Sequence, residues 1–209
     1  MKDFTMNIMT KGNMNFKVGL VIMASGLGKR FGSNKLMEPL NNMPLIKWVL
    51  NASDELFDAR VVVTRSNEVK ELCANLNIDC ILHDFPNRND TVKLGLDRLK
   101  NDIDYCFFMV GDQPLISKET IKNMIMYAGN NKDRIVRAGF GEVLGSPIGF
   151  PKSFFDELLC LPKGKGGSFV AKNNPSSVNI FNVNNDFELW DVDTRADLDQ
   201  ILNTICLYK

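Results

Sequence analysis

The chain has 209 residues, 25 basic and 25 acidic side chains, a formal net charge of zero and 44% hydrophobic residues. This balance excludes a disordered chain, which would combine low hydrophobicity with high net charge, and the length fits one domain. A nucleic-acid partner is disfavoured, because affinity for the phosphate backbone needs a surplus of Lys and Arg. We expect no membrane partner either, because no apolar run approaches the roughly 18 residues that a membrane-spanning helix needs.

Residues 1–15 differ in character from the rest of the chain. They contain no apolar stretch of the kind that a secretion signal carries, and hydrophobic patterning begins only at Phe16. We therefore expect residues 1–15 to be a disordered polar leader and residues 16–209 to form a single domain. The five cysteines include no C-x-x-C pair, which argues against a disulfide scaffold or a zinc ribbon and favours a cytoplasmic location.

Short apolar runs predict the strands of a parallel sheet. Three of them are unbroken rather than alternating, as in strands that are buried on both faces. These three cover Val18–Ala24, Ala59–Thr64 and Tyr105–Val110. Weaker strand patterns lie at 78–82, 134–140, 146–150 and 176–183.

Between the strands, apolar residues recur at helical spacing. The pattern predicts helices at 45–50, 68–76, 92–99, 118–128, 153–159 and 167–172, and a last helix that Thr194 caps and that ends near residue 206. Strands that alternate with helices indicate βαβ units with right-handed crossovers. The predicted fold class is therefore α/β, a three-layer α/β/α sandwich around a Rossmann-like, mostly parallel sheet.

A glycine-rich segment, ASGLGKRFGSNK at 24–35, follows the first strand. Ligands of open α/β sheets bind beyond the carboxyl ends of the strands, and glycines there let the backbone approach phosphate oxygens. The glycines at 26, 28 and 32 do not match the G-x-G-x-x-G dinucleotide motif, and no window matches a P-loop. The acidic residue that a dinucleotide site needs after the second strand is also missing, which leaves a dehydrogenase as the weakest alternative.

A second segment, VGDQPL at 110–115, ends the third strand. Asp112 would lie beside the glycine-rich segment at the same edge of the sheet. Mg²⁺ prefers one or two carboxylates together with phosphate oxygens and waters. We therefore expect Asp112 to anchor Mg²⁺ against a bound triphosphate.

Four motifs together resemble the MobA-like nucleotidyltransferase family, in its molybdenum cofactor cytidylyltransferase branch. They are G-x-G-x-R-x-G-x-x-K in the glycine-rich segment, GDQPL after the third strand, RNDTVKLGL at 88–96, and GSPIGFP with WDVDTRADL at 145–151 and 190–198. They occur in the order that the family has them. The resemblance implies a fold like that of the nucleotide-diphospho-sugar transferases.

The resemblance also implies roles for individual residues. Arg30 and Lys35 would neutralise phosphate charge and act with Asp112 as the catalytic residues, and Asp193, or else Asp191, would be the second Mg²⁺ ligand. The nucleotide-binding residues would be Ala24, Ser25, Gly26, Leu27, Gly28, Lys35, Arg88, Thr91 and Gly95. Gly28 and Ser146 depart from the residues that are common in the family at these positions.

The implied activity is transfer of CMP from CTP to a phosphorylated molybdopterin-type cofactor, with a molybdenum hydroxylase as the later recipient. CTP is favoured over GTP because Ala24-Ser25-Gly26 is closer to the Ala-Ala-Gly of cytosine users than to the Ala-Gly-Gly of guanine users. One alternative is a cytidylyltransferase for a sugar or isoprenoid phosphate on the same fold. The other, suggested by the departures at Gly28 and Ser146, is an accessory protein that carries the cofactor without turnover.

Overall fold

The computed structural model describes residues 16–26, 31 and 34–207. The expected leader at 1–15 and three of the expected site residues, Leu27, Gly28 and Arg30, lie outside the described residues. None of the helices in the described ranges is long and apolar enough to cross a membrane.

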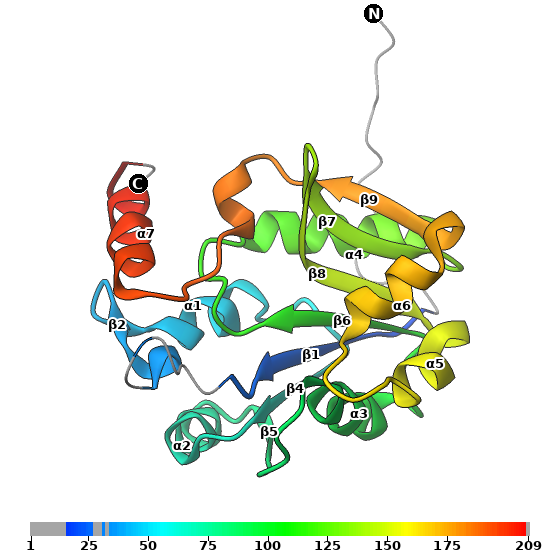
Figure 1. Ribbon diagram of the computed structural model, residues 1–209, viewed down its shortest axis with the longest axis horizontal. Coiled ribbons are helices and arrows are strands. Elements are labelled where there is room, and N and C mark those ends of the chain that lie inside the picture. The colour runs from blue at the N-terminus through cyan, green and yellow to red at the C-terminus, as the bar shows by residue number, and fades with distance from the viewer. Residues whose placement is uncertain (1–15, 27–30, 32–33, 208–209) are drawn as a thin grey trace, which may run out of the picture.

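A seven-stranded sheet forms the centre of the molecule, in the order β5-β4-β1-β6-β8-β7-β9 (Figure 1). Only β8 runs antiparallel to its neighbours, so the predicted mostly parallel sheet is confirmed. The strands are β1 (Val18–Ala24), β4 (Ala59–Thr64), β5 (Asp79–Leu82), β6 (Tyr105–Val110), β7 (Ile135–Phe140), β8 (Val143–Pro151) and β9 (Val178–Asn182).

Helices cover both faces of this sheet, as the separate hydrophobic clusters on its two sides show. Leu20 and Ile22 of β1 belong to one cluster and Val21 to the other, which explains why the strand is an unbroken apolar run. One cluster includes residues of α1 (Leu45–Ala52), α2 (Asn67–Asn75), α4 (Lys118–Asn130) and α7 (Arg195–Leu207); the other includes residues of α3 (Arg88–Leu99), α5 (Phe155–Leu159) and α6 (Gly167–Asn173). The three-layer sandwich is confirmed.

The start of α3 differs from the prediction. The helix begins at Arg88 rather than near residue 92, because Asn87 and Asp90 form a capping box in which the Asn87 N–H donates to Asp90 Oδ2 at 3.2 Å. Thr91 therefore lies within the first turn of the helix rather than just before it. The polar first turn hid this boundary from a reading based on apolar spacing.

A small hairpin of β2 (Pro39–Leu40) and β3 (Met43–Pro44) was not predicted. Asn41 and Asn42 connect the two strands with φ values of 50° and 63°. Two consecutive positive φ angles suit a type I′ turn, in which asparagine is favoured. The Asn-Asn pair was the sequence signal for this hairpin.

The order of the strands places a topological switch point beside β1. The chain passes from β1 outward to β4 and β5, and α3 then returns it to β6 on the other side of β1. In open α/β sheets the crevice at such a point, beyond the carboxyl ends of the strands, is the usual ligand site. The carboxyl ends of β1 and β6 therefore locate the candidate site.

Candidate active site

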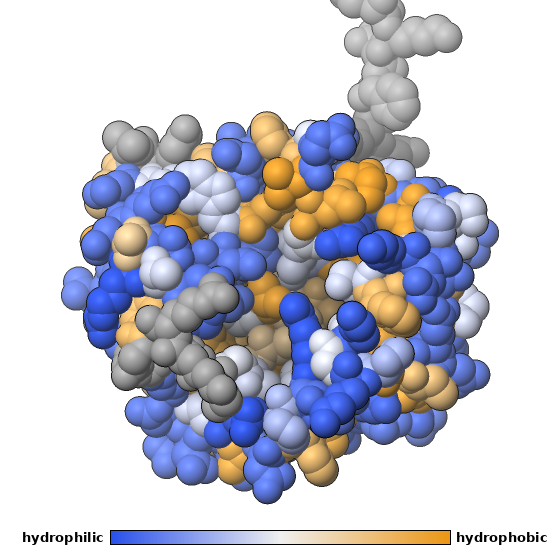
Figure 2. Space-filling model, in the orientation of Figure 1, coloured by the Kyte–Doolittle hydropathy of each residue, from blue (hydrophilic) through white to orange (hydrophobic). Residues whose placement is uncertain are grey.

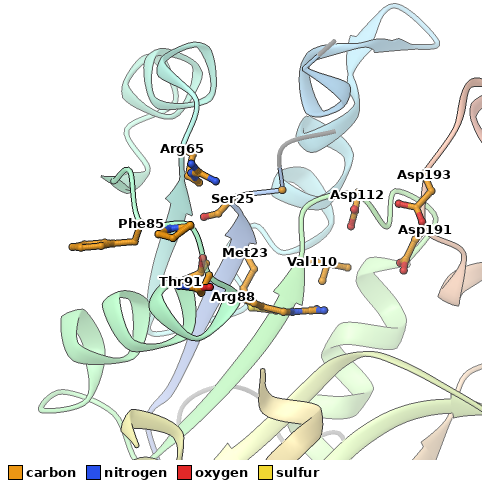
Figure 3. A pocket seen from close by; sticks show the side chains of 13 residues that line it. Met23, Ser25, Arg65, Phe85, Arg88, Thr91, Val110, Asp112, Asp191 and Asp193 are labelled. Atoms are coloured by element: carbon orange, nitrogen blue, oxygen red, sulfur yellow. The ribbon is translucent and has the colours of Figure 1, made fainter. Parts of the chain in front are cut away.

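A cavity of about 530 Å³ opens at this switch point (Figure 3). Charged side chains line much of it, with aspartates on one wall and arginines on the other. The lining residues are Met23, Ser25, Gly26, Arg65, Phe85, Pro86, Asn87, Arg88, Thr91, Val110, Asp112, Asp191 and Asp193.

The cavity contrasts with an apolar patch elsewhere on the surface. The β7–β8 turn and the edge strand β9 expose Phe140, Val143, Leu144 and Ile180, and Figure 2 shows apolar surface over these elements. None of these four side chains lines the cavity. The charged cavity, rather than this patch, is therefore the place to look for phosphate chemistry.

The aspartates Asp112, Asp191 and Asp193 form one wall of the cavity, the acidic wall, and Lys35 forms ion pairs with two of them. It lies in a 3-10 turn (Lys35–Met37) that follows the glycine-rich segment, and it is 7% exposed. Its Nζ is 2.6 Å from Asp112 Oδ2 and 3.2 Å from Asp193 Oδ1, and it donates to the Val192 carbonyl at 2.7 Å. The Val192 N–H in turn donates to the Asp112 carbonyl at 2.9 Å. Three segments that are distant in the sequence thus meet at one ammonium group.

Among the residues that the structure describes, this wall combines three carboxylates, Asp112, Asp191 and Asp193, with the ammonium group of Lys35. Burial lowers the pKa of Lys35, but the ion pair with Asp112 and the hydrogen bonds with Asp112 and Asp193 outweigh burial and raise the pKa above 10.5. Burial and, secondly, the charge of Asp112 raise the pKa of Asp191 to about 6. One lysine therefore faces three carboxylates, and the wall is suited to attract a further cation.

The raised pKa of Asp191 predicts a titration close to neutral pH. The folded protein holds this proton more tightly than the unfolded chain, whose aspartate has a pKa of 3.8. The carboxylate therefore destabilises the fold above about pH 6, and this cost disappears as the pH falls toward 3.8. A carboxylate NMR titration should show Asp191 near pH 6, and Asp112→Asn should lower that value by removing a neighbouring charge. A value near 4 that is unchanged by the substitution would contradict the proposed crowding of carboxylates.

Ser25 and Thr91 lie on the opposite side of the cavity (Figure 3). The Ser25 hydroxyl donates to the Val63 carbonyl at 3.1 Å, and His83 Nε2 lies 2.8 Å from Ser25 Oγ. Burial and the nearby Arg65 charge lower the pKa of His83, so the ring is neutral at pH 7. The side chain of Ser25 is thereby held in place by two strand ends.

Arg65 is a lining residue that sequence reasoning missed. It follows the last residue of β4 and lies beside Ser25 and Gly26 at the cavity (Figure 3). The rule that pointed to Asp112, a polar residue directly after a buried parallel strand, also applies to Arg65. In the sequence, Arg65 stands where a dinucleotide site needs an acidic residue, and this mismatch drew attention away from the arginine itself.

The remaining predicted nucleotide-binding residues differ in position. Arg88 lines the cavity, whereas Ala24 is buried beneath it, where its carbonyl accepts a hydrogen bond from the Thr64 hydroxyl at 3.0 Å. Gly95 does not line the cavity but packs between α3 and the sheet. The structure therefore places Gly95 in the core, because helix and sheet approach closely there, and not at the expected nucleotide site.

Gly95→Ala is expected to destabilise the fold without changing nucleotide affinity. A Cβ at Gly95 would overlap Val21 Cγ1 and would lie 3.1 Å from Val63 Cγ2. Such overpacking costs about 1–3 kcal/mol, of which the better helix propensity of alanine offsets up to about 1 kcal/mol. Urea denaturation would measure the loss, and adding Val21→Ala should cost less than the sum of the single changes. A weaker nucleotide affinity at unchanged stability would restore the original assignment.

The residues of the acidic wall can be tested for a fit to Mg²⁺. Among residues 16–26, 31 and 34–207, no group of three or more His, Cys, Asp or Glu side chains is arranged to hold a metal ion. Mg²⁺ does not require such a group, because it binds through one or two carboxylates when substrate phosphates complete its shell. Asp112 and Asp193 both face the cavity and already share one cation, Lys35. This donor set fits a metal that arrives with a triphosphate.

Comparisons with known proteins agree with this geometry. The chain is 31% identical over 126 residues to a probable molybdenum cofactor guanylyltransferase of Natranaerobius thermophilus, a match that covers 59% of this chain and 60% of the relative. It is also 33% identical over 121 residues to a 2-C-methyl-D-erythritol 4-phosphate cytidylyltransferase of Endomicrobium trichonymphae, a match that covers 56% of this chain and 55% of the relative. The matched region thus spans less than two thirds of the length of either relative.

The fold has solved counterparts as well. The crystal structure of Rv0371c from Mycobacterium tuberculosis superposes with a TM-score of 0.80 at 22% identity and covers 90% of this chain and 98% of that one. At that identity the likeness concerns the fold alone. The model of the MobA-like NTP transferase domain matches residues 20–178, which include most of β1, Lys35, all of α3 and Asp112. The chain therefore belongs to the MobA-like NTP transferase family.

Proposed function

We infer that this protein is a nucleotidyltransferase that transfers CMP from CTP to a phosphorylated molybdopterin-type cofactor and releases pyrophosphate. The observation that carries this proposal is the ion pair between Lys35 and Asp112 at the switch-point cavity. The pair brings a phosphate-neutralising cation and a strand-end carboxylate together at the place where α/β folds bind nucleotides. Family membership supports the same reaction class.

The chemistry requires little covalent help from the protein. An oxygen of the acceptor phosphate attacks the α-phosphorus in line, and the bond to the pyrophosphate breaks. The attacking phosphate is already ionised at neutral pH, so no general base is needed, and the single histidine of the chain is no obstacle. Lys35 would offset the charge that develops on the leaving pyrophosphate, a role in which Arg30 is expected to join it. For Mg²⁺, which supplies further charge neutralisation when bound, Asp112 and Asp193 are the residues that would hold it.

The nucleotide and the acceptor rest on separate arguments. CTP is proposed from the resemblance of Ala24-Ser25-Gly26 to cytosine users, although the guanylyltransferase relative makes GTP the natural competitor. The molybdopterin-type acceptor is supported by the likeness to that same molybdenum cofactor guanylyltransferase, and a molybdenum hydroxylase would then receive the product. The cytidylyltransferase relative favours the alternative acceptor, an isoprenoid or sugar phosphate.

A single matrix of assays tests the proposal. CTP, GTP, ATP and UTP are each combined with Mg²⁺ and with molybdopterin, methylerythritol phosphate or N-acetylglucosamine 1-phosphate, and released pyrophosphate is measured. We expect release with CTP and molybdopterin. Release only with methylerythritol phosphate or the sugar phosphate would replace the proposed acceptor, and release with GTP alone would replace the proposed nucleotide.

A further inference from the structure

The segment Lys163–Gly167 lies against the start of α3, close to the cavity. The Gly164 N–H donates to Asn89 Oδ1 at 2.8 Å, and Asn89 is 6% exposed. Asn89 is itself held by its Nδ2, which donates to Asp90 Oδ1 at 3.0 Å. A buried amide thus ties this lysine-bearing segment to the helix that begins with Arg88.

The side chain of Arg88 runs along the same segment. A Cβ at Gly166 would lie 3.1 Å from Arg88 Nε and 3.2 Å from its Cδ, so only glycine leaves this path fully open. Figure 3 shows Arg88 extending from the start of α3 across the cavity toward Val110 and Asp191.

The guanidinium of Arg88 makes no ion pair or hydrogen bond with any residue in the part of the chain that the structure describes. A guanidinium in this position offers a planar fork of donors that matches two oxygens of a phosphate group. Arg88 lines the same cavity as Ser25 and Thr91, but its side chain points away from these two residues (Figure 3).

Transfer between two phosphates brings two anions into contact, and each needs its own cation. Lys35 serves the triphosphate on the acidic wall, whereas Arg88 reaches the centre of the cavity from the opposite wall. Lys163 and Lys165 add two positive charges to the segment that packs against the Arg88 side chain. The positions of these groups leave Arg88 free for the second anion.

We propose that Arg88, guided by the Lys163–Gly167 segment, binds the phosphate monoester of the acceptor. This inference rests on the proposed function and names its acceptor site. Arg88 holds two of the phosphate oxygens, and a remaining oxygen forms the bond to the α-phosphorus while the bond to pyrophosphate breaks with its electron pair. No proton changes place in this step.

The test measures the binding of the two anions, the acceptor phosphate and the triphosphate, in separate titrations of the full chain. Inorganic phosphate, as a probe for the acceptor phosphate, is titrated into protein that is saturated with CTP and Mg²⁺, and CTP affinity is measured separately. Arg88→Gln should weaken phosphate affinity about tenfold or more, because a charge-assisted bidentate contact is lost, and should change CTP affinity less than twofold. Arg98→Gln is the matched control on the same helix, since Arg98 pairs with Asp79 at 2.7 Å, away from the cavity lining.

Kinetic measurements on two variants, Arg88→Gln and Gly166→Ala, provide a second test. With an active acceptor, Arg88→Gln should raise the acceptor KM about tenfold and leave the KM for CTP unchanged, and Gly166→Ala should shift the acceptor KM in the same direction by less. Equal losses of CTP and phosphate affinity, or unchanged phosphate affinity, would overturn the inference. Phosphate binding that depends on Arg88 without pyrophosphate release from any acceptor would instead overturn the proposed function and leave the site standing.

Discussion

Asp112→Asn should reduce pyrophosphate release by roughly a thousandfold, the upper end of what one preorganised electrostatic group contributes. Asparagine keeps the size of the side chain but removes the charge that pairs with Lys35 at 2.6 Å. It also removes the carboxylate that is expected to hold Mg²⁺. CTP affinity in the absence of Mg²⁺ should change much less than affinity in its presence, and titrations under both conditions would show the difference.

The same variant separates an enzyme from the non-catalytic carrier that remained as an alternative. A carrier would release no pyrophosphate before the substitution and would keep its affinity for the cofactor afterwards. Asp97→Asn is the matched control, because Asp97 is an exposed residue of α3 that pairs only locally, with Lys100. Full activity of the Asp112→Asn variant would show that Asp112 has no role in catalysis or in Mg²⁺ binding.

The sheet was predictable because burial on both faces leaves a clear signal. Each of the three unbroken apolar runs is a central strand of the sheet, with the expected bounds. The start of α3 was not found because its first turn is polar and its signal, Asn87 with Asp90, lies in capping rather than in apolar spacing. Predictions from hydrophobic periodicity therefore succeed at buried elements and fail at their polar ends.

The site was predictable to the extent that it depends on strand ends. Asp112 and Ser25 follow β6 and β1, and the parallel sheet brings them to one edge. Gly95 was expected at the nucleotide because a helical glycine serves close packing or ligand approach equally well in the sequence, whereas the structure packs it against Val21 and Val63, away from the cavity lining. The direction of Arg88 depends on Gly166, a contact between distant segments that no local pattern contains.

The ion-pair partners of Lys35 could not be predicted from the residues around it in the sequence. Its contacts, Asp112 and Asp193, are far away in the sequence, and the resemblance gave the lysine only a phosphate role. The structure adds a second role, because the ammonium also holds the strand end and the segment before α7 together. Lys35 should therefore affect stability as well as rate.

Lys35→Met is accordingly expected to lose both activity and stability. Methionine fills a similar volume, but Asp112 and Asp193 then lose the ammonium group that they share, and the Val192 carbonyl loses its donor. Breaking a buried ion pair costs about 3–5 kcal/mol; because Asp193 is 58% exposed, we expect about 1–3 kcal/mol here. Pyrophosphate release should fall by roughly a hundredfold or more.

The pH dependence of that loss identifies its cause. If repulsion among the carboxylates destabilises Lys35→Met, lowering the pH from 8 to 5 should narrow the difference in unfolding free energy between the variant and the wild type. The reason is that Asp191, whose pKa is raised to about 6, then takes up a proton and the repulsion is relieved. Urea denaturation across this range measures the gap, with Lys152→Met as the control at an exposed lysine outside the cavity. A gap that stays constant with pH would mean that Lys35 acts through packing alone, and the electrostatic account of the acidic wall would then be wrong.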